Sequence, residues 1–323
     1  MNSVPRLAHL EDYRRSIVEG APPLPDMAQR MLLDTLGLGN RQAIDFLAFE
    51  QPTQTDFEAW ILATAGEPDD DLVLRYNAWA QGESDAQPKS KRLDAVDAMP
   101  DVLGPEELAH WQAEGFVVVP QAIDAEHCAA VEAALWDEIG AHQDDPDSWY
   151  GLSIDGIMVP LYQHPAITNA RQSVRLHKAF ARLWGTADLW MTIDQLGFNP
   201  PERVDQIFQG SGIHWDVSLV QPVPFATQAV IYLTDTAEDQ GAFRCVPGFH
   251  HRLAGWLEGL NGQNPREVDL AADAKCIPGK AGDCVIWRQD LPHGASPNHS
   301  NKPRLTQYLN YYSPQLKVAE EWL

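Results

Sequence analysis

Apolar residues recur at intervals of three and four along the first part of the chain, which is the spacing expected of amphipathic helices. The clearest runs lie at 27–33, 41–47 and 56–62, and Thr55 stands where a helix N-cap would precede the last of them. Side chains that ligate metals or act as nucleophiles do not cluster in this region. The pattern predicts an accessory helical segment over residues 1–85, without indicating its role.

A polar, proline-containing stretch, residues 86–101, follows this segment and predicts a linker. Beyond it, helical periodicity and one short apolar run precede a change of texture near residue 189. Asp124 is placed to cap the second of the predicted helices. The predicted elements are helices over 105–114, 125–139 and 171–184 and a strand over 115–120.

From residue 189 onward, short runs rich in β-branched and aromatic residues alternate with Gly, Pro, Asn and Asp. Strands at this density, broken by turn residues, favour a sandwich or barrel over a parallel α/β sheet. With the helices upstream they predict an α+β fold in which residues 102–323 form one domain. The predicted strands are 190–198, 213–219, 228–233, 241–246, 283–287 and 304–312.

Composition changes this picture mainly through charge. The chain has 323 residues, of which 46 are acidic and 23 basic, so its formal net charge is −23. Because phosphate contacts need clustered Lys and Arg, we expect neither nucleic acid nor a membrane surface among its partners. The sequence shows no secretory signal and no apolar run of membrane-spanning length, and its four cysteines lack C-x-x-C spacing. We therefore expect a cytoplasmic protein with reduced thiols.

Candidate metal ligands occur in two places far apart in the chain. His214 and Asp216 flank Trp215, and on a strand such a pair leaves the same face. His293 follows the predicted strand 283–287 and would have to fold back alongside them. Two imidazoles and one carboxylate form the facial triad that holds non-haem Fe(II) and leaves positions open. The H-x-D triplet alone carries little weight, but with His293 it predicts an iron centre.

Arg304 opens the last predicted strand, eleven positions after His293. Arg304 and Thr306 would share one face of that strand. A guanidinium is a planar, two-pronged cation suited to a carboxylate. This predicts a binding site for a carboxylate next to the metal, although an arginine on an edge strand can also serve only in a surface ion pair.

The region from His214 to Tyr312 resembles the phytanoyl-CoA dioxygenase family of Fe(II)/2-oxoglutarate-dependent oxygenases. Besides the triplet at 214–216, the matching pieces are residues 239–250, 282–283 and 292–294, with Asn298 and Arg304. Residues 104–135 also look like the opening segment of that family, so the resemblance spans roughly residues 100–315.

The resemblance implies a double-stranded β-helix of the cupin, jelly-roll type, with His214, Asp216 and His293 as ligands of Fe(II). It implies that Arg304, with Thr306, binds the far carboxylate of 2-oxoglutarate, and that O₂ is the oxidant. Tyr232 and Gln195 fall where family members place further co-substrate contacts. Strand residues with a buried body and a polar tip are an equally good interpretation of these two.

The expected function is a dioxygenase that hydroxylates an unactivated C–H bond of a small-molecule metabolite and releases succinate and CO₂. Desaturation, cyclisation and epimerisation remain open, as does the oligomeric state. Asn199 stands where members acting on CoA thioesters often carry Lys, which weakens the case for a CoA substrate. The carboxylate of Asp216 argues against halogenation, because related halogenases have Gly or Ala there. The alternatives are a cupin-type metalloenzyme without 2-oxoglutarate and a non-catalytic ligand-binding protein that retains the fold.

Overall fold

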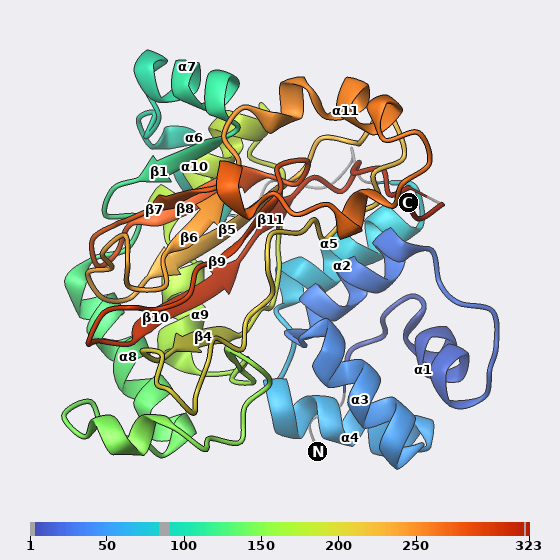
Figure 1. Cartoon of the computed structure of the whole chain (residues 1–323). Helices are drawn as coiled ribbons and strands as arrows, with labels where there is room; N and C mark the ends of the chain where they lie inside the picture. The colour runs from blue at the N-terminus through green and yellow to red at the C-terminus, as the bar shows by residue number, and fades with distance from the viewer. Residues whose placement is uncertain (1–3, 84–90, 320) are drawn as a thin grey trace.

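The centre of the molecule is a six-stranded antiparallel sheet packed against a smaller three-stranded one (Figure 1). The computed structural model describes residues 4–83, 91–319 and 321–323. The large sheet has the order β1-β8-β5-β10-β4-β2, the small sheet has the order β7-β6-β9, and β11 pairs with β3. The strands are β1 (Phe116–Val119), β2 (Met158–Val159), β3 (Trp190–Met191), β4 (Leu196–Asn199), β5 (Thr227–Tyr232), β6 (Phe243–Cys245), β7 (Lys275–Ile277), β8 (Cys284–Arg288), β9 (His293–Ala295), β10 (Arg304–Leu309) and β11 (Tyr311–Tyr312).

Eleven α-helices in the described residues surround these strands. They are α1 (Leu10–Val18), α2 (Asp26–Leu36), α3 (Asn40–Glu50), α4 (Gln54–Ala65), α5 (Asp70–Ala80), α6 (Lys91–Ala98), α7 (Pro105–Glu114), α8 (Ala125–Ile139), α9 (Pro165–Arg171), α10 (Val174–Trp184) and α11 (Leu253–Gly259). None of the described helices is both long and apolar enough to cross a membrane. The fold is α+β with a jelly-roll core, as the sequence and the family resemblance predicted.

The large sheet is buried on both faces, because successive side chains of a strand point to opposite sides. In β5, Ala229 and Ile231 pack toward helices α8 and α10, whereas Val230 and Tyr232 face the small sheet. The strand therefore reads as a continuous apolar run rather than an alternating one. Apolar side chains of both sheets, Phe243 and Trp287 among them, pack between the sheets, and these two also line a cavity.

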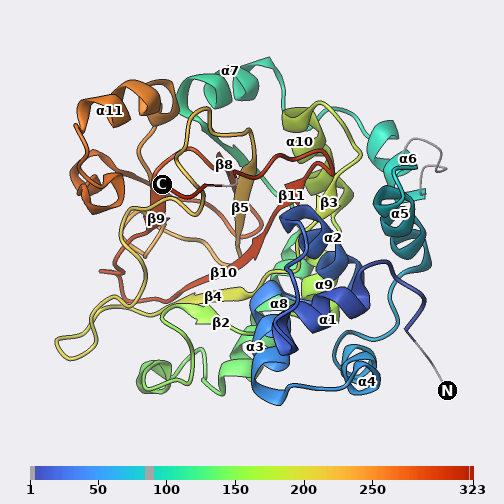
Figure 2. The same cartoon turned by 90° about the vertical axis from the view of Figure 1, so that its right-hand side faces the viewer.

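The N-terminal helices form their own apolar core, and this core includes side chains from the strands. Trp190 of β3 and Tyr312 of β11 are buried among residues of α1 to α5. Figure 2 shows these helices on one side of the strand assembly, with α2 close to β3 and β11. The helical segment is thus packed on the residues that follow it. The division into residues 1–85, 86–101 and 102–323 remains a prediction.

Part of the predicted linker is helical. Residues 86–90 lie outside the described residues, but Lys91–Ala98 forms α6, which packs on α10. Its Leu93 and Val96 are buried. The sequence did not predict a helix there because the segment has too few apolar residues to form a recognisable apolar face. The few that it has are buried by packing against α10.

Several element boundaries differ from those predicted, and side-chain hydrogen bonds account for the differences. Helices α7 and α8 match, and Asp124 caps α8 as expected by accepting from the His127 backbone N–H at 2.9 Å. The predicted helix over 171–184 starts later, because Ser173 caps α10 through the Leu176 N–H. The N-cap of α4 is Thr53 rather than Thr55, since the Thr53 hydroxyl accepts from the Asp56 N–H.

Two predicted strands are each divided in two, and a third predicted strand does not form. The run 190–198 divides into β3 and β4, and the run 304–312 divides into β10 and β11. At these breaks the Thr192 hydroxyl accepts from the Asn310 N–H at 2.8 Å, so a side chain replaces a ladder contact. The run 213–219 is no strand at all; it makes a single bridge at His214. All four cysteines are free, as predicted.

A buried carboxyl joins the helical segment to the strands. Asp34 of α2 accepts hydrogen bonds from the Tyr312 hydroxyl and from the Ile193 N–H. Burial raises the pKa of Asp34 to about 7, and the two hydrogen bonds only partly offset this. The folded protein therefore keeps a proton on Asp34 that the unfolded chain loses near its ordinary pKa of 3.8.

We expect the stability that Asp34 contributes to be lost as the pH rises from about 4 to 7, because the folded state then binds more protons than the unfolded state. An Asp34→Asn variant should lack this component, so it should gain stability relative to the wild type between pH 5 and pH 8, by at most about 3 kcal/mol. Urea unfolding of both proteins at the two pH values measures the difference, and groups common to both cancel. An equal pH dependence in the two proteins would contradict the assignment.

Candidate metal centre

The two histidines are brought together by the only bridge that the segment around His214 makes with β9. The backbone N–H of His214 donates to the His293 carbonyl and the reverse bond also forms, both at 2.9 Å. Each Nδ1 lies near a carbonyl two residues earlier, Gly212 for His214 at 2.8 Å and Leu291 for His293 at 3.0 Å. An Nδ1–H that donates to such a carbonyl leaves Nε2 with its lone pair free for a metal.

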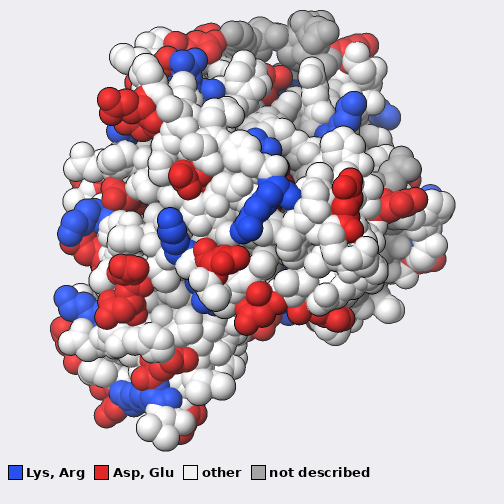
Figure 3. All heavy atoms as spheres, turned by 45° about the horizontal axis from the view of Figure 1, so that its top comes forward, with Lys and Arg blue, Asp and Glu red and all other residues white. Residues whose placement is uncertain are grey.

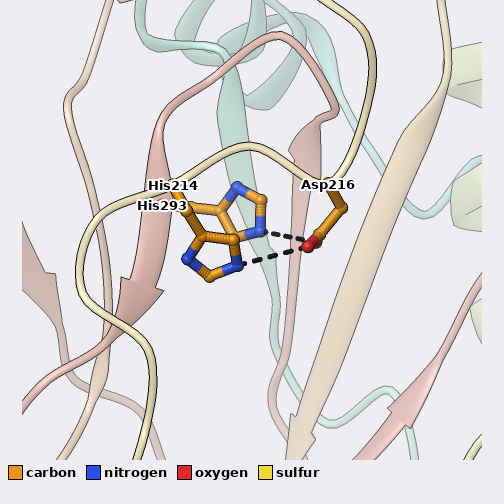
Figure 4. Close-up of side chains that lie close together, drawn as sticks. All are labelled: His214, Asp216 and His293. Atoms are coloured by element: carbon orange, nitrogen blue, oxygen red, sulfur yellow. Dashed lines mark hydrogen bonds and ion pairs between the residues drawn. The ribbon is translucent and has the colours of Figure 1, made fainter. Parts of the chain in front are cut away.

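Both Nε2 atoms face the carboxylate of Asp216 (Figure 4). The Nε2 of His214 lies 3.2 Å from Oδ1, and that of His293 lies 3.2 Å from Oδ2. One ligand atom from each of the three residues lies within 4.8 Å of the others. His293 is buried, whereas Asp216 is half exposed toward the cavity. Two imidazoles and a carboxylate converging on one point, with the remaining side open, fit the facial triad of non-haem Fe(II).

The electrostatics of this cluster favour the ionised carboxylate. Burial works against ionisation of Asp216, but hydrogen bonds from the two imidazoles outweigh it and hold its pKa well below the usual range. Burial likewise opposes protonation of His214, but the hydrogen bond to Asp216 and its charge raise the pKa of that imidazole. A metal ion bound by the two imidazoles would likewise place positive charge next to the carboxylate.

Gln228 of β5, which the sequence analysis did not single out, holds the carboxylate from the other side. Its Nε2 donates to Asp216 Oδ2 at 2.6 Å, and its Oε1 accepts from the Trp287 indole N–H at 3.1 Å. The indole fixes which end of the Gln228 amide faces Asp216. No local pattern marks Gln228, because its neighbours in the contact lie 12 and 59 positions away.

Replacing Gln228 with Leu is expected to weaken metal binding by about 10-fold to 100-fold, the range typical for loss of a hydrogen-bonding partner of a ligand. The carboxylate would keep its charge but lose the donor that orients it. Titration with Co(II), followed by the absorbance of the metal centre, measures the affinity. Gln289→Leu is a matched control, since Gln289 lines the same cavity and its amide donates to the Pro224 carbonyl rather than to a ligand. Equal affinities of the Gln228 variant and the wild type would contradict this role.

Arg304 and Thr306 of β10 lie on one face of their strand, as predicted, and both side chains are buried. Gly197 on β4 lies opposite Thr306, and a Cβ there would come within 2.4 Å of the Thr306 hydroxyl oxygen. The glycine thus leaves room beside the two polar groups. The Nε of Arg304 and the hydroxyl of Thr306 have no hydrogen-bond partner. Buried donors without partners are costly, so this pair fits the carboxylate of a bound acid.

The structure separates the two further candidates. Gln195 lines the cavity, and its Oε1 accepts from the Tyr162 hydroxyl at 3.1 Å. Tyr232 does not line it: the Tyr232 hydroxyl donates to the Ile277 carbonyl at 2.7 Å and accepts from the Phe243 N–H at 2.9 Å. These contacts give Tyr232 a structural role, in which its side chain joins β5 to the small sheet, and its predicted co-substrate contact stays a prediction.

The cluster of His214, Asp216 and His293 shares one cavity of about 720 Å³ with Arg304. This volume is in the range of small-molecule sites. Two segments outside the central sheets complete its lining. Helix α2 contributes Asp26 and Arg30, and the C-terminal segment contributes Leu316 to Ala319 and Trp322. On the face shown in Figure 3, acidic and basic side chains are interspersed rather than gathered by sign.

Comparisons with known proteins show the family to which the chain belongs. The model of the family described as "Phytanoyl-CoA dioxygenase (PhyH)" matches residues 111–306. A protein of Dictyostelium discoideum named "Putative phytanoyl-CoA dioxygenase" is 24% identical over 252 residues, which cover 61% of this chain and 72% of that protein. EvdO2 from Micromonospora carbonacea var. aurantiaca has a similar structure, with a TM-score of 0.51, 17% identity, and coverage of 70% of this chain and 97% of EvdO2.

EvdO2 has also been solved in complex with 2-oxoglutarate, and that structure gives a TM-score of 0.52 at 16% identity, with 70% of this chain and 96% of the other covered. At such identities the likeness shows the fold alone. A jelly-roll core with a His-Asp-His cluster beside a cavity is typical of non-haem iron oxygenases. The chain belongs to the phytanoyl-CoA dioxygenase family and is an Fe(II)- and 2-oxoglutarate-dependent oxygenase.

Proposed function

We propose that His214, Asp216 and His293 hold the Fe(II) of this oxygenase and that Arg304, with Thr306, binds the far carboxylate of 2-oxoglutarate. We further propose that the enzyme hydroxylates a C–H bond of a small-molecule substrate in the cavity. The observation that carries the proposal is the pairing of the two sites in one cavity. A convergent metal-ligand set lies beside a buried guanidinium whose Nε has no partner.

Iron, 2-oxoglutarate and O₂, when bound, would supply the oxidant that removes hydrogen from a C–H bond, with one oxygen atom of O₂ going to succinate and with release of CO₂. The chain's own residues bind and orient. Gln228 holds the Asp216 carboxylate, and the Nδ1 contacts of the two histidines present Nε2 toward the metal position. Strand β10, which carries Arg304, is paired with both β4 and β5 and so holds the guanidinium in place. The guanidinium would thereby set the orientation of the bound diacid.

Water exclusion is the second task of the protein. His293 and Arg304 are almost fully buried, and Phe243 and Trp287 pack within 6.2 and 5.0 Å of the His293 ring, centroid to centroid. Asp216 is half exposed and lines the cavity, where a substrate has room. Arg304 and Thr306 weigh against a cupin-type enzyme that dispenses with 2-oxoglutarate, because such an enzyme would leave their buried donors without a partner.

The test is to supply the purified protein with Fe(II), 2-oxoglutarate and a panel of candidate metabolites, and to follow succinate release together with the masses of the metabolites. We expect one metabolite to gain one oxygen atom in step with succinate release. Loss of two hydrogen atoms would replace hydroxylation with desaturation or ring formation. The proposed roles of the site would be overturned if no reaction released succinate, not even slowly from 2-oxoglutarate in the absence of a substrate.

A further inference from the structure

The segment that carries Asp216 is irregular, yet its backbone is held firmly by one side chain. The carbonyls of Trp215 and Val217, on either side of Asp216, pair with no strand in the described part of the chain. Arg266 donates to both, from Nη1 to the Trp215 carbonyl at 2.7 Å and from Nη2 to the Val217 carbonyl at 2.6 Å. Arg266 lies in a short 3-10 helix, Pro265–Glu267, about fifty positions further along the chain.

In a regular sheet, backbone N–H groups of the next strand would satisfy such carbonyls. Here a guanidinium does so, and it is well suited because its five donors lie in one plane at fixed angles. A carboxylate that must present an oxygen to a metal depends on the backbone from which it projects. By bonding to the peptide groups before and after Asp216, Arg266 restricts the rotation of that backbone.

The same guanidinium binds the C-terminal segment. Its Nη2 and Nε donate to the Leu323 carbonyl at 2.8 and 3.2 Å, and the Trp322 ring lies over it at 4.8 Å. A further contact runs from the Leu323 N–H to the Ser218 hydroxyl at 3.2 Å. Trp322 lines the cavity. One arginine thus joins the metal-ligand segment to a wall of the cavity.

We propose that Arg266 is a positioning residue that keeps the Asp216 segment in its metal-binding shape and anchors the C-terminal wall of the cavity to that segment. The proposal rests on the proposed function in taking Asp216 as a metal ligand. It assigns Arg266 no contact with the metal or the substrate. Its effect passes through the carbonyls of Trp215 and Val217.

Two readouts test the proposal, and the second does not involve a metal. Arg266→Ala should weaken Co(II) binding by about tenfold or more, as loss of ligand support does elsewhere. In the metal-free protein, backbone hydrogen exchange should rise in residues 213–219 and also in 313–319. Arg266→Lys should restore little, because an ammonium group keeps the charge but lacks the fork. Arg252→Ala is the matched control: Arg252 packs on Phe249 and pairs with Asp273 rather than with a backbone carbonyl of either segment.

The Trp322→Ala variant distinguishes the contact of Arg266 with the C-terminal segment from its contacts with the Trp215 and Val217 carbonyls. It should raise exchange only in 313–319 and leave Co(II) affinity within about twofold of the wild type, because the contacts with the two carbonyls remain.

The proposal is overturned if Arg266→Ala binds Co(II) like the wild type with unchanged exchange over 213–219. It is also overturned if Trp322→Ala weakens Co(II) binding as much as Arg266→Ala does. If the wild type itself binds no Co(II), the proposed function fails, whereas exchange over 213–219 still tests Arg266. Thermal unfolding of each variant shows whether it is folded.

Discussion

Replacing Asp216 with alanine is expected to abolish stable Fe(II) binding and, with it, the conversion of 2-oxoglutarate to succinate. The carboxylate is the single anionic group among the three candidate ligands, and both imidazoles are oriented toward it. Loss of groups that merely support a ligand costs 10-fold to 100-fold in affinity, so loss of the ligand should exceed about 100-fold. His214→Ala should act in the same direction.

Iron content after anaerobic reconstitution and succinate formation measure this effect. Asp155→Ala is a suitable control, because Asp155 lines the same cavity but pairs with Arg41 rather than with the histidines. If the Asp216 variant kept its iron and its turnover, the three residues would not be the metal site of this enzyme.

Replacing Arg304 with leucine is expected to raise the 2-oxoglutarate concentration needed for half-maximal turnover by at least about 100-fold. Removing one partner of a buried, hydrogen-bonded ion pair costs about 3–5 kcal/mol, and each 1.4 kcal/mol is a factor of ten. Iron content should stay at the wild-type level, because Arg304 is absent from the ligand cluster. This combination distinguishes a co-substrate residue from a metal ligand.

Steady-state turnover against 2-oxoglutarate concentration gives the measurement. Arg304→Lys is the informative companion: it keeps the charge but loses the fork, and should fall between the wild type and the leucine variant. An unchanged dependence on 2-oxoglutarate in the leucine variant would reject the role of Arg304 and leave the unpartnered Thr306 hydroxyl without an explanation.

The sequence predicted the structure well where residues close together in the chain determine it. The ends of α7 and α8 match the predicted ranges, because a glycine or an aspartate marks each start and Gly115 and Gly140 follow each end. The order of His214, Asp216, His293 and Arg304 also indicated the family and the cofactors. These are properties of side-chain type and short spacing, and they can be read along the chain.

Tertiary packing decided the rest. The sequence predicted a strand over 213–219, but the structure has an irregular segment whose carbonyls are satisfied by Arg266. It offered Tyr232 as a contact of the co-substrate, but the Tyr232 hydroxyl is taken up by backbone groups of the small sheet. Gln228, which orients Asp216, carried no signal at all. In each case the deciding partner lies many positions away.

The sequence by itself therefore determined the class of fold and the side chains that we propose as ligands of a metal and of a diacid. Only the tertiary structure decided which of those atoms meet, and that helix α2 and the C-terminal segment help to line the cavity. The physical reason is that hydrophobic period and ligand type are local properties. Whether a buried polar group finds a partner depends on which distant segment packs against it.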